Sequence, residues 1–315
     1  MTIKITGTGS ALPEQRVTNF DLAKKVDTSD AWIRERTGIV ERRISDEQKG
    51  ESVAFLSAKA ATNALEMAGR TAQEIDLILV ATCSPEMMLP CCACQVQGMI
   101  GAQNAVAFDI NAACSGFLFA LETAYAYLKT GLYRNALIIG AEVLSKLVDW
   151  SDRSTCVLFG DGAGAVLIEK DETENKERFL SFAQGSDGAK GMVLSCERQG
   201  YVQMNGQEVY RFAVKQVPAC IDVALERAGL SVSDIDLFVL HQANVRIIEA
   251  VAKRLKVDME KFPVNLDRVG NMSSATVPVL LDELNREGKL KAGQRLVLSG
   301  FGAGLTYGAC VLEWG

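Results

Sequence analysis

The chain has 315 residues, 48% of them hydrophobic and 23% charged, which is enough apolar material for one large core or two fused cores. A net charge of -6 excludes the broadly basic surface that nucleic-acid-binding proteins present. No apolar run approaches the ~20 residues that span a bilayer, and the N-terminus has no signal-peptide pattern. We therefore expect a cytoplasmic globular protein that binds neither nucleic acid nor a membrane.

Apolar, β-rich runs alternate with helical patterns along the whole chain. In the first half these runs are LILVAT, AVAFDI, ALIIGA and GAVLIE, at residues 77–82, 105–110, 136–141 and 164–169. In the second half they are LFVLH, RLVLSG and ACVLEW, at residues 237–241, 295–300 and 309–314. This alternation predicts an α/β fold whose strands are buried on both faces.

The chain also contains an internal repeat with an offset of 160 residues. ALEMAGRTAQEIDL at 64–77 matches ALERAGLSVSDIDL at 224–237, and RNALIIG matches QRLVLSG at the same offset. Gly69 and Gly229 stand at equivalent positions in the longer pair, where helices usually end. A period this long predicts two copies of one half-domain rather than a solenoid.

A charged run, DETENKER at residues 171–178, separates the two copies. Such a run is most simply a solvated turn. We therefore place the boundary within it and predict halves at residues 1–172 and 173–315.

Nine cysteines are spread through the chain, at positions 83, 91, 92, 94, 114, 156, 196, 220 and 310. Without a secretory context we predict that they are free thiols. His241 is the only histidine, so a zinc site is poorly supported and we predict no metal. The same fact excludes any mechanism that uses two histidines.

Cys114 is the candidate nucleophile. It follows the run AVAFDI and the turn 111–113, and it opens the helical pattern CSGFLFALETAYAYLKTG. Backbone N–H groups at a helix N-terminus favour the thiolate, and strand-to-helix turns often present nucleophiles. The alternative is that Cys114, like most free cysteines, is a small buried apolar residue.

Two further residues lie where a site is expected. His241 ends the run LFVLH, whereas Ala81 occupies the equivalent position of the first copy. The carboxyl ends of strands are where α/β sheets usually bind ligands. Asn271 lies in the loop DRVGNMSSATVP, where an Asn after Gly is ordinarily a turn residue.

Cys114, His241 and Asn271, in these contexts, resemble the Cys-His-Asn site of the β-ketoacyl-acyl-carrier-protein synthase III family, the initiating condensing enzymes of bacterial fatty acid synthesis. The resemblance covers the whole chain and includes DAWIRERTGIVERR, ACQVQ, NAACSGF, SDRSTCVLFGDGAGA, HQAN, VGNMSSATVP and FGAGLTYGA. It implies a thiolase-like fold, with two βαβαβαββ halves about a pseudo-twofold axis in five αβαβα layers, and a homodimer.

The resemblance also implies a reaction. An acyl-CoA primer would acylate Cys114, and malonyl-acyl carrier protein would then lose CO2 and attack, giving 3-oxoacyl-acyl carrier protein and CoA without a cofactor. His241 Nε2 and the Asn271 amide would stabilise the enolate. The backbone N–H of Cys114, with one from the turn that ends at Gly304, would form a second oxyanion hole.

Substrate contacts follow from the same resemblance. Trp32 and Arg153 resemble the pair that sandwiches the CoA adenine, Arg36 resembles the contact to its phosphates, and Asn244 resembles the contact to pantetheine. Leu89 stands at the acyl-pocket wall, where acetyl-selective relatives tend to have an aromatic residue. The alternative for Leu89 is packing in the dimer interface.

Basic residues after HQAN suggest where the carrier protein docks. Arg246, Lys253 and Lys256 are spaced to share one helical stripe, and with Arg211 they form a candidate dock for an acidic carrier protein. The alternative is a solvated helix face.

The competing functions require different catalytic residues. Elongating condensing enzymes need two histidines, and thiolases need a second reactive cysteine near the C-terminus, where Cys310 lies inside a predicted strand. A Cys-His-Asn polyketide synthase of the chalcone type, or another secondary-metabolite relative, is the main alternative. A non-catalytic binding scaffold with an inert Cys114 is the alternative from a different class.

Overall fold

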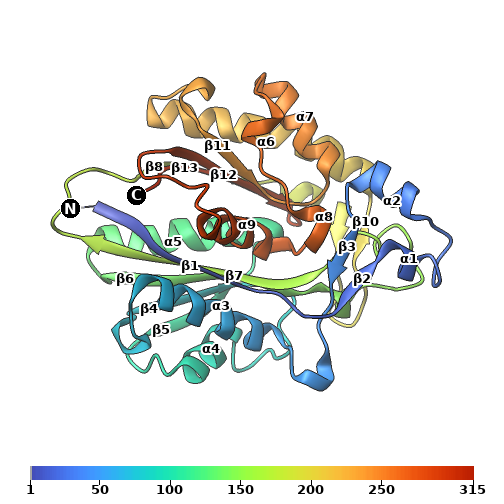
Figure 1. Ribbon diagram of the computed structural model, residues 1–315, viewed down its shortest axis with the longest axis horizontal. Helices are drawn as coiled ribbons and strands as arrows, with labels where there is room; N and C mark the ends of the chain where they lie inside the picture. Colours follow the sequence, from blue (N-terminus) through green and yellow to red (C-terminus); the bar gives the residue numbers. More distant parts are fainter. Residues whose placement is uncertain (1) are drawn as a thin grey trace.

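The computed structural model describes residues 2–315 and contains two stacked sheets (Figure 1). The first has the strand order β1-β7-β6-β4-β5, with β1 (Thr2–Ala11), β4 (Leu77–Ala81), β5 (Val106–Ile110), β6 (Asn135–Val143) and β7 (Asp161–Asp171). The second has the order β8-β13-β12-β11, with β8 (Phe179–Ser186), β11 (Leu237–Leu240), β12 (Arg295–Gly302) and β13 (Thr306–Glu313). Two small ribbons pair β2 (Arg16–Thr18) with β3 (Glu41–Arg43) and β9 (Leu194–Ser195) with β10 (Gln203–Met204).

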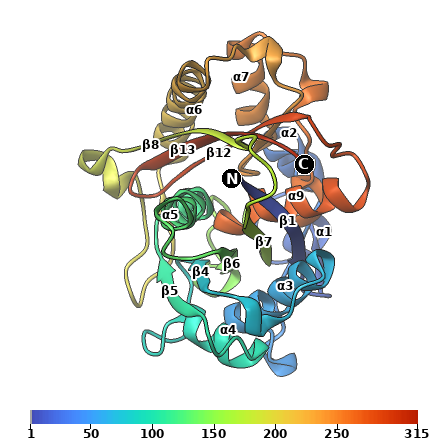
Figure 2. The same ribbon diagram turned by 90° about the vertical axis from the view of Figure 1, so that its left-hand side faces the viewer.

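Helices form three layers around and between these sheets (Figures 1 and 2). The outer face of the first sheet carries α3 (Val53–Ala68) and α4 (Cys92–Ile100), and that of the second carries α6 (Gly206–Ala228) and α7 (Val245–Leu255). Between the sheets lie α5 (Gly116–Thr130) and α9 (Thr276–Arg286). Short helices are α1 (Asn19–Leu22), α2 (Asp30–Thr37) and α8 (Leu266–Val269). The predicted αβαβα layering of a thiolase-like fold is confirmed.

The duplication is visible in the pairing of strands. In each sheet two parallel neighbours, β4 with β6 and β11 with β12, continue into antiparallel strands, β7 with β1 and β13 with β8. The turns before α5 and α9 share an unusual backbone conformation, a positive φ at a non-glycine residue. Ala113 has φ 45°, and Ser273, 160 residues later, has φ 47°. The predicted helix ends are confirmed at Gly69 and Gly229, which adopt φ 63° and 67°.

The two halves differ in one strand. The segment 160 residues after β5 (106 to 110, hence 266 to 270) contains helix α8, and among residues 2–315 the second sheet has no counterpart of β5. The sequences explain this difference: VAFDI is rich in residues that favour strands, whereas LDRVG carries two charges and ends in Gly270 at φ 69°. The charged run 171–178 connects β7 to β8, and the division into halves at residues 1–172 and 173–315 stays a prediction.

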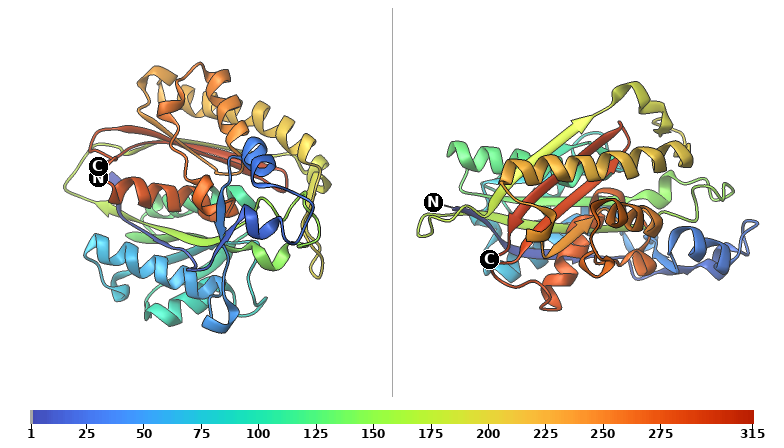
Figure 3. Two further views of the ribbon diagram at one scale, coloured as in Figure 1. Left: turned by 45° about the vertical axis from the view of Figure 1, so that its right-hand side comes forward. Right: turned by 90° about the horizontal axis from the view of Figure 1, so that it is seen from above.

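An N-terminal excursion joins the halves beside the site. The segment from β2 to β3 leaves the first sheet, and its helix α2 contacts α7 of the second half (Figure 3). Gly38, at φ 81°, ends α2, and a Cβ there would lie 2.8 Å from a methyl carbon of Val245, so only glycine permits this approach. This packing places the side chains of α2 next to the loop that follows β11.

Candidate active site

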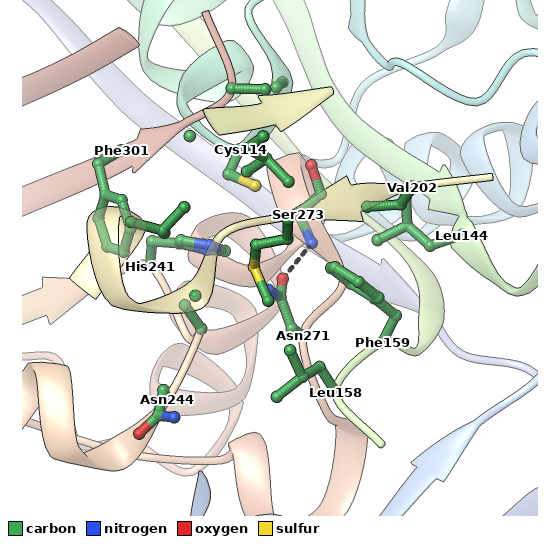
Figure 4. A pocket seen from close by; sticks show the side chains of 18 of the residues that line it. Cys114, Leu144, Leu158, Phe159, Val202, His241, Asn244, Asn271, Ser273 and Phe301 are labelled. Carbon is green, nitrogen blue, oxygen red and sulfur yellow. Dashed lines mark hydrogen bonds between the residues drawn. The ribbon is translucent and has the colours of Figure 1, made fainter. Parts of the chain in front are cut away.

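The three candidate catalytic residues line one cavity of about 770 Å³ (Figure 4). Cys114 comes from the turn between β5 and α5, His241 from the end of β11, and Asn271 from the segment after α8. Figure 4 shows their side chains converging from three sides. Apolar side chains form much of the surrounding wall, including those of Leu144, Leu158, Phe159, Val202 and Phe301.

Cys114 is a thiol in this environment. It lies in a 3-10 turn, Ala113–Ser115, directly before α5. Burial raises the pKa of Cys114 to about 12 and outweighs the opposite effect of the nearby Ser273 hydroxyl. Burial therefore opposes the thiolate that the helix N-terminus was expected to favour, because removing the charge from water is unfavourable. Cys114 needs a proton acceptor before it can act as a nucleophile.

His241 is a neutral imidazole with one fixed partner. Its side chain is 3% exposed, and burial lowers its pKa to about 3. The Nδ1 atom lies 2.7 Å from the Thr276 hydroxyl, which in turn lies 3.0 Å from the Ser273 carbonyl oxygen. The other ring nitrogen, Nε2, is the atom left for chemistry in the cavity.

Thr276, which the sequence analysis missed, permits either tautomer of the histidine. Its hydroxyl can accept a hydrogen bond from Nδ1–H of His241 while donating to the Ser273 carbonyl, which leaves a lone pair on Nε2. The hydroxyl can instead donate to Nδ1, and the proton is then on Nε2. His241 can thus serve either as a proton acceptor or as a hydrogen-bond donor.

The amide of Asn271 has its orientation fixed by the backbone. Its side-chain Oδ1 accepts a hydrogen bond of 2.8 Å from the Ser273 N–H. Asn271 N–H donates to the Leu158 carbonyl and Asn271 C=O accepts from Gly160 N–H, both at 2.9 Å. Within residues 2–315 the Nδ2 group has no hydrogen-bond partner, so Asn271 presents a donor to the cavity.

The glycine turn lies against the nucleophile. A Cβ at Gly302 would lie 2.7 Å from the backbone nitrogen of Cys114, so only glycine fits there. Gly302 and Ala303 line the cavity, whereas Gly304 lies one residue beyond the lining. The oxyanion-hole role of this turn stays a prediction.

The residues assigned to CoA by resemblance gather around one indole. The guanidinium carbon of Arg36 lies 4.6 Å from the Trp32 ring centroid, and that of Arg153 lies 5.4 Å from it. Arg153 also donates to the Asp27 carbonyl oxygen at 2.7 Å. Arg36 lines the cavity, so this cationic, aromatic cluster stands at its rim.

Asn244 connects this rim to helix α7. Its Nδ2 donates to the Arg36 carbonyl at 2.9 Å, and its Oδ1 accepts from the Arg246 N–H at 2.9 Å as the N-cap of α7. Asn244 lines the cavity as well. Its contact with pantetheine stays a prediction.

The four basic residues assigned to carrier docking are all exposed. Arg211 on α6 and Arg246 on α7 line the cavity, while Lys253 and Lys256 lie further along or just beyond α7. Arg211 is paired with Glu208 at 2.6 Å. The opposite face of α7 is buried, at Ile248, Val251 and Leu255.

Leu89 does not lie with the other candidate site residues. It lies in the connection between β4 and α4, its exposed fraction is 82%, and it does not line the cavity of its own chain. Its role in primer choice stays a prediction.

All nine cysteines are free thiols, as predicted. Among residues 2–315, no group of three or more His, Cys, Asp and Glu side chains is arranged to hold a metal ion. In the same part of the chain, no helix combines the length and apolar character needed to cross a membrane.

Sequence and structure comparisons relate the chain to known proteins. The family model described as 3-oxoacyl-[acyl-carrier-protein] synthase III matches residues 108–188, and the model of its C-terminal part matches residues 225–314. The β-ketoacyl-[acyl-carrier-protein] synthase III of Oceanobacillus iheyensis is 49% identical over 315 residues, covering 100% of both chains. That of Clostridium acetobutylicum is also 49% identical, covering 99% of this chain and 98% of its own.

Solved structures agree with these matches. The 3-oxoacyl-[acyl-carrier-protein] synthase III from Aquifex aeolicus superposes with a TM-score of 0.96 at 45% identity, covering 99% of this chain and 100% of its own. A priming β-ketosynthase from the R1128 polyketide pathway superposes with a TM-score of 0.93 at 35% identity, covering 99% and 96%. The chain therefore belongs to the β-ketoacyl-[acyl-carrier-protein] synthase III family.

Proposed function

We propose that this enzyme condenses an acyl-CoA primer with malonyl-acyl carrier protein, giving 3-oxoacyl-acyl carrier protein, CoA and CO2, and so initiates fatty acid synthesis. The observation that carries this proposal is the convergence of a thiol, a neutral imidazole and an oriented amide in one largely apolar cavity. No cofactor is required, because the carbanion forms by loss of CO2 and its electrons stay within the substrates.

The first half-reaction is acyl transfer. Cys114 attacks the thioester carbonyl, and the Nε2 lone pair of neutral His241 accepts its proton while Nδ1–H donates to Thr276. The C–S bond to CoA then breaks, and CoA leaves as the thiol with the proton returned by His241. Backbone N–H groups of Cys114 and of the turn after Gly302 stabilise the tetrahedral oxyanion.

The second half-reaction is decarboxylative condensation. The bond to the malonyl carboxylate breaks, CO2 leaves, and the electron pair moves to an enolate whose oxygen needs hydrogen-bond donors. Asn271 Nδ2 supplies one donor, and His241 Nε2–H supplies the other when Thr276 donates to Nδ1. The enolate carbon attacks the acyl-cysteine, the C–S bond breaks, and the released Cys114 thiolate takes up a proton from solvent, so that one proton is consumed per turnover.

The rim residues support the two substrates. Trp32 with Arg153 would hold the CoA adenine, and Arg36 its phosphates, which suits planar cations next to an aromatic ring. Arg211 and Arg246 flank the cavity and carry charge opposite to that of an acidic carrier protein. In this proposal both substrates reach Cys114 through the same opening.

We infer that the enzyme is a homodimer. Strand β5 is an open edge of the first sheet, with Val106 47% exposed, and Met88 and Leu89 are 64% and 82% exposed in the segment before α4. Leu89 lies outside the cavity of its own chain, so its proposed contact with the primer requires a second copy. Sedimentation equilibrium would test the dimer, and a monomer at micromolar concentration would contradict it.

The secondary-metabolite alternative shares the triad, and the priming polyketide β-ketosynthase, at 35% identity, is less similar to this chain than the Oceanobacillus iheyensis synthase III, at 49%. Turnover assays with acyl-CoA primers and malonyl-acyl carrier protein distinguish the two candidate functions.

The assignment of the triad is tested by separating the half-reactions. Cys114→Ala should abolish condensation yet retain malonyl decarboxylation, because the enolate donors remain. His241→Ala or Asn271→Ala should slow decarboxylation by about 10² to 10³. If both of these variants decarboxylated malonyl-carrier protein at the wild-type rate, the proposed roles would be wrong.

A further inference from the structure

Glu142 is a completely buried carboxyl group close to the site. It lies near the end of β6 in a mostly apolar strand, and its exposed fraction is 0%. Its Oε2 atom accepts hydrogen bonds from the Ser84 hydroxyl at 2.6 Å and the Cys83 N–H at 3.1 Å. Its Oε1 atom lies 3.0 Å from the Ser274 hydroxyl. Within residues 2–315, no ion pair involves Glu142.

The hydrogen bonds of the Ser274 hydroxyl indicate the protonation state of this carboxyl. The Ser274 Oγ atom also lies 2.8 Å from the Ala81 carbonyl oxygen, which can only accept. A hydroxyl has one proton, and donation of it to Ala81, the shorter contact, makes Ser274 an acceptor toward Glu142. Glu142 can donate only as the neutral acid. Burial raises the pKa of the Glu142 carboxyl, in the direction that this proton requires.

Among the residues that the structure describes, the surroundings of Glu142 contain no positive charge, and burial outweighs the hydrogen-bond donors that favour its charged form. The groups that face it are the Thr82 hydroxyl, the Cys83 thiol, the Ser84 hydroxyl and the Ser274 hydroxyl. The titratable neighbours are cysteines, Cys83 in contact and Cys114 further away, and a thiolate on either would repel a carboxylate. An ionised Glu142 would be an unpaired buried charge, which is costly.

Glu142 joins two segments that build the cavity. Through Cys83 and Ser84 it holds the residues after β4, where Cys83 lines the cavity. Through Ser274 it holds the short turn between Asn271 and Thr276, whose backbone includes the Ser273 N–H that orients the Asn271 amide. The Ser273 carbonyl also receives the Thr276 hydroxyl that contacts His241. Both enolate donors therefore depend on a segment that Glu142 supports.

We propose that Glu142, as a neutral carboxylic acid, is a positioning residue that fixes the segment 271–276 and so aligns the two donors used in decarboxylation. This inference rests on the proposed function and adds a residue to it. Acyl transfer to Cys114 also uses His241, whose Nδ1 partner Thr276 lies in this segment, but it does not use the Asn271 donor. The expected signature is therefore a larger loss in decarboxylation than in acyl transfer.

Two substitutions at Glu142 compare a neutral side chain that keeps its hydrogen bonds with one that removes them. In Glu142→Gln the amide N–H2 can donate to Ser274 and the amide oxygen can accept from Ser84, so decarboxylation should stay near the wild-type rate. Glu142→Leu keeps the volume and removes both bonds, and it should slow decarboxylation by up to about 100-fold, the typical effect of small misplacement. Acylation of Cys114 by radiolabelled acyl-CoA should stay near the wild-type rate in Glu142→Gln and should slow less than decarboxylation does in Glu142→Leu.

Ser274→Ala provides the same test without altering Glu142, in case Glu142→Leu fails to fold. It removes the hydroxyl that Glu142 meets, and it should reproduce the larger loss in decarboxylation. Ser10→Ala is the matched control, because Ser10 donates to another buried carboxyl, Asp282, at 2.6 Å, and does not line the cavity. The control should leave both half-reactions unchanged.

Infrared spectroscopy reads the proton directly and needs no substrate. Protein labelled with 13C-carboxyl glutamate should show a carboxylic-acid C=O band at neutral pH that Glu142→Gln removes. A carboxylate at this position, a Glu142→Gln variant as slow as Glu142→Leu, or wild-type decarboxylation in both Glu142→Leu and Ser274→Ala would each overturn the inference. Failure of the wild-type enzyme to decarboxylate malonyl-carrier protein would instead refute the proposed function.

Discussion

Substituting Asn271 by alanine removes two hydrogen bonds with separable consequences. The first runs from the Ser273 N–H to Oδ1 at 2.8 Å, and Asn271 is only 6% exposed. Leaving that N–H unpaired in a buried site costs about 1–3 kcal/mol of folding stability. The second is the bond from Nδ2 to the enolate oxygen, and losing one such donor raises the activation free energy by about 2.7–4 kcal/mol.

The variant should therefore be less stable and also slower in one half-reaction. Urea unfolding should report a loss of about 1–3 kcal/mol, and CO2 release from malonyl-carrier protein should slow by about 10² to 10³. Acylation of Cys114 by acyl-CoA should proceed at the wild-type rate, because Asn271 takes no part in it.

Asn271→Asp separates the two effects. Its carboxylate can still accept from the Ser273 N–H, so stability should recover, yet an ionised carboxylate offers no donor and decarboxylation should remain slow. The reasoning would be refuted if Asn271→Ala lost stability but kept the wild-type rate of CO2 release, since Nδ2 would then not contribute to the transition state.

Four further outcomes follow from the site. Burial raises the pKa of Cys114 to about 12, so raising the pH should increase its thiolate fraction. Iodoacetamide should therefore alkylate Cys114 about tenfold faster per pH unit from about pH 6 to about pH 9, as measured by peptide mass mapping. An alkylation rate that reached a plateau below about pH 8 would contradict a resting thiol. Thr276→Val should slow both half-reactions in steady-state assays, since the histidine loses its Nδ1 partner, whereas Thr276→Ser should not; equal rates in all three proteins would exclude that role. Charge reversal at Arg246 and Lys253 should lower carrier-dependent turnover mainly at low salt, and unchanged kinetics there would remove them from the docking surface. Leu89→Phe should shift competition between acetyl-CoA and butyryl-CoA or isobutyryl-CoA toward acetyl, with about 1–3 kcal/mol available per methylene, and an unmoved ratio would exclude Leu89 from the pocket.

Much of the architecture could be predicted because its signals are local or repeated. The apolar runs became strands, and the 160-residue offset became two related sheets that share a central helical layer. The missing fifth strand of the second sheet was not predicted, because the resemblance supplied a symmetric pair of halves. The charged segment at α8 could have indicated it, since LDRV lacks the β-branched and aromatic residues of VAFDI.

The site was predictable where position alone indicates chemistry. Cys114 and His241 stood at strand ends in the sequence, whereas Asn271 depended on resemblance. Thr276 and Glu142 could not be found in this way, because their contacts join segments far apart in the chain, from Thr276 to His241 and from Glu142 to Ser274. The one available signal was a glutamate inside the apolar run NALIIGAEV.

The protonation state of the nucleophile needed the tertiary structure as well. Sequence predicts the helix N-terminus that favours a thiolate, but the burial that opposes it depends on how the two halves close over Cys114. The larger of these two effects could only be identified once the cavity was known.

The central claim is tested most directly by incubating the wild-type enzyme with malonyl-acyl carrier protein and a panel of acyl-CoA primers, and measuring CoA, CO2 and carrier-bound product together. We expect equal amounts of CoA, CO2 and 3-oxoacyl-carrier protein for at least one primer, with none of the condensation product from Cys114→Ala. Turnover of acyl-CoA without a 3-oxoacyl product, or equal product from Cys114→Ala, would contradict it.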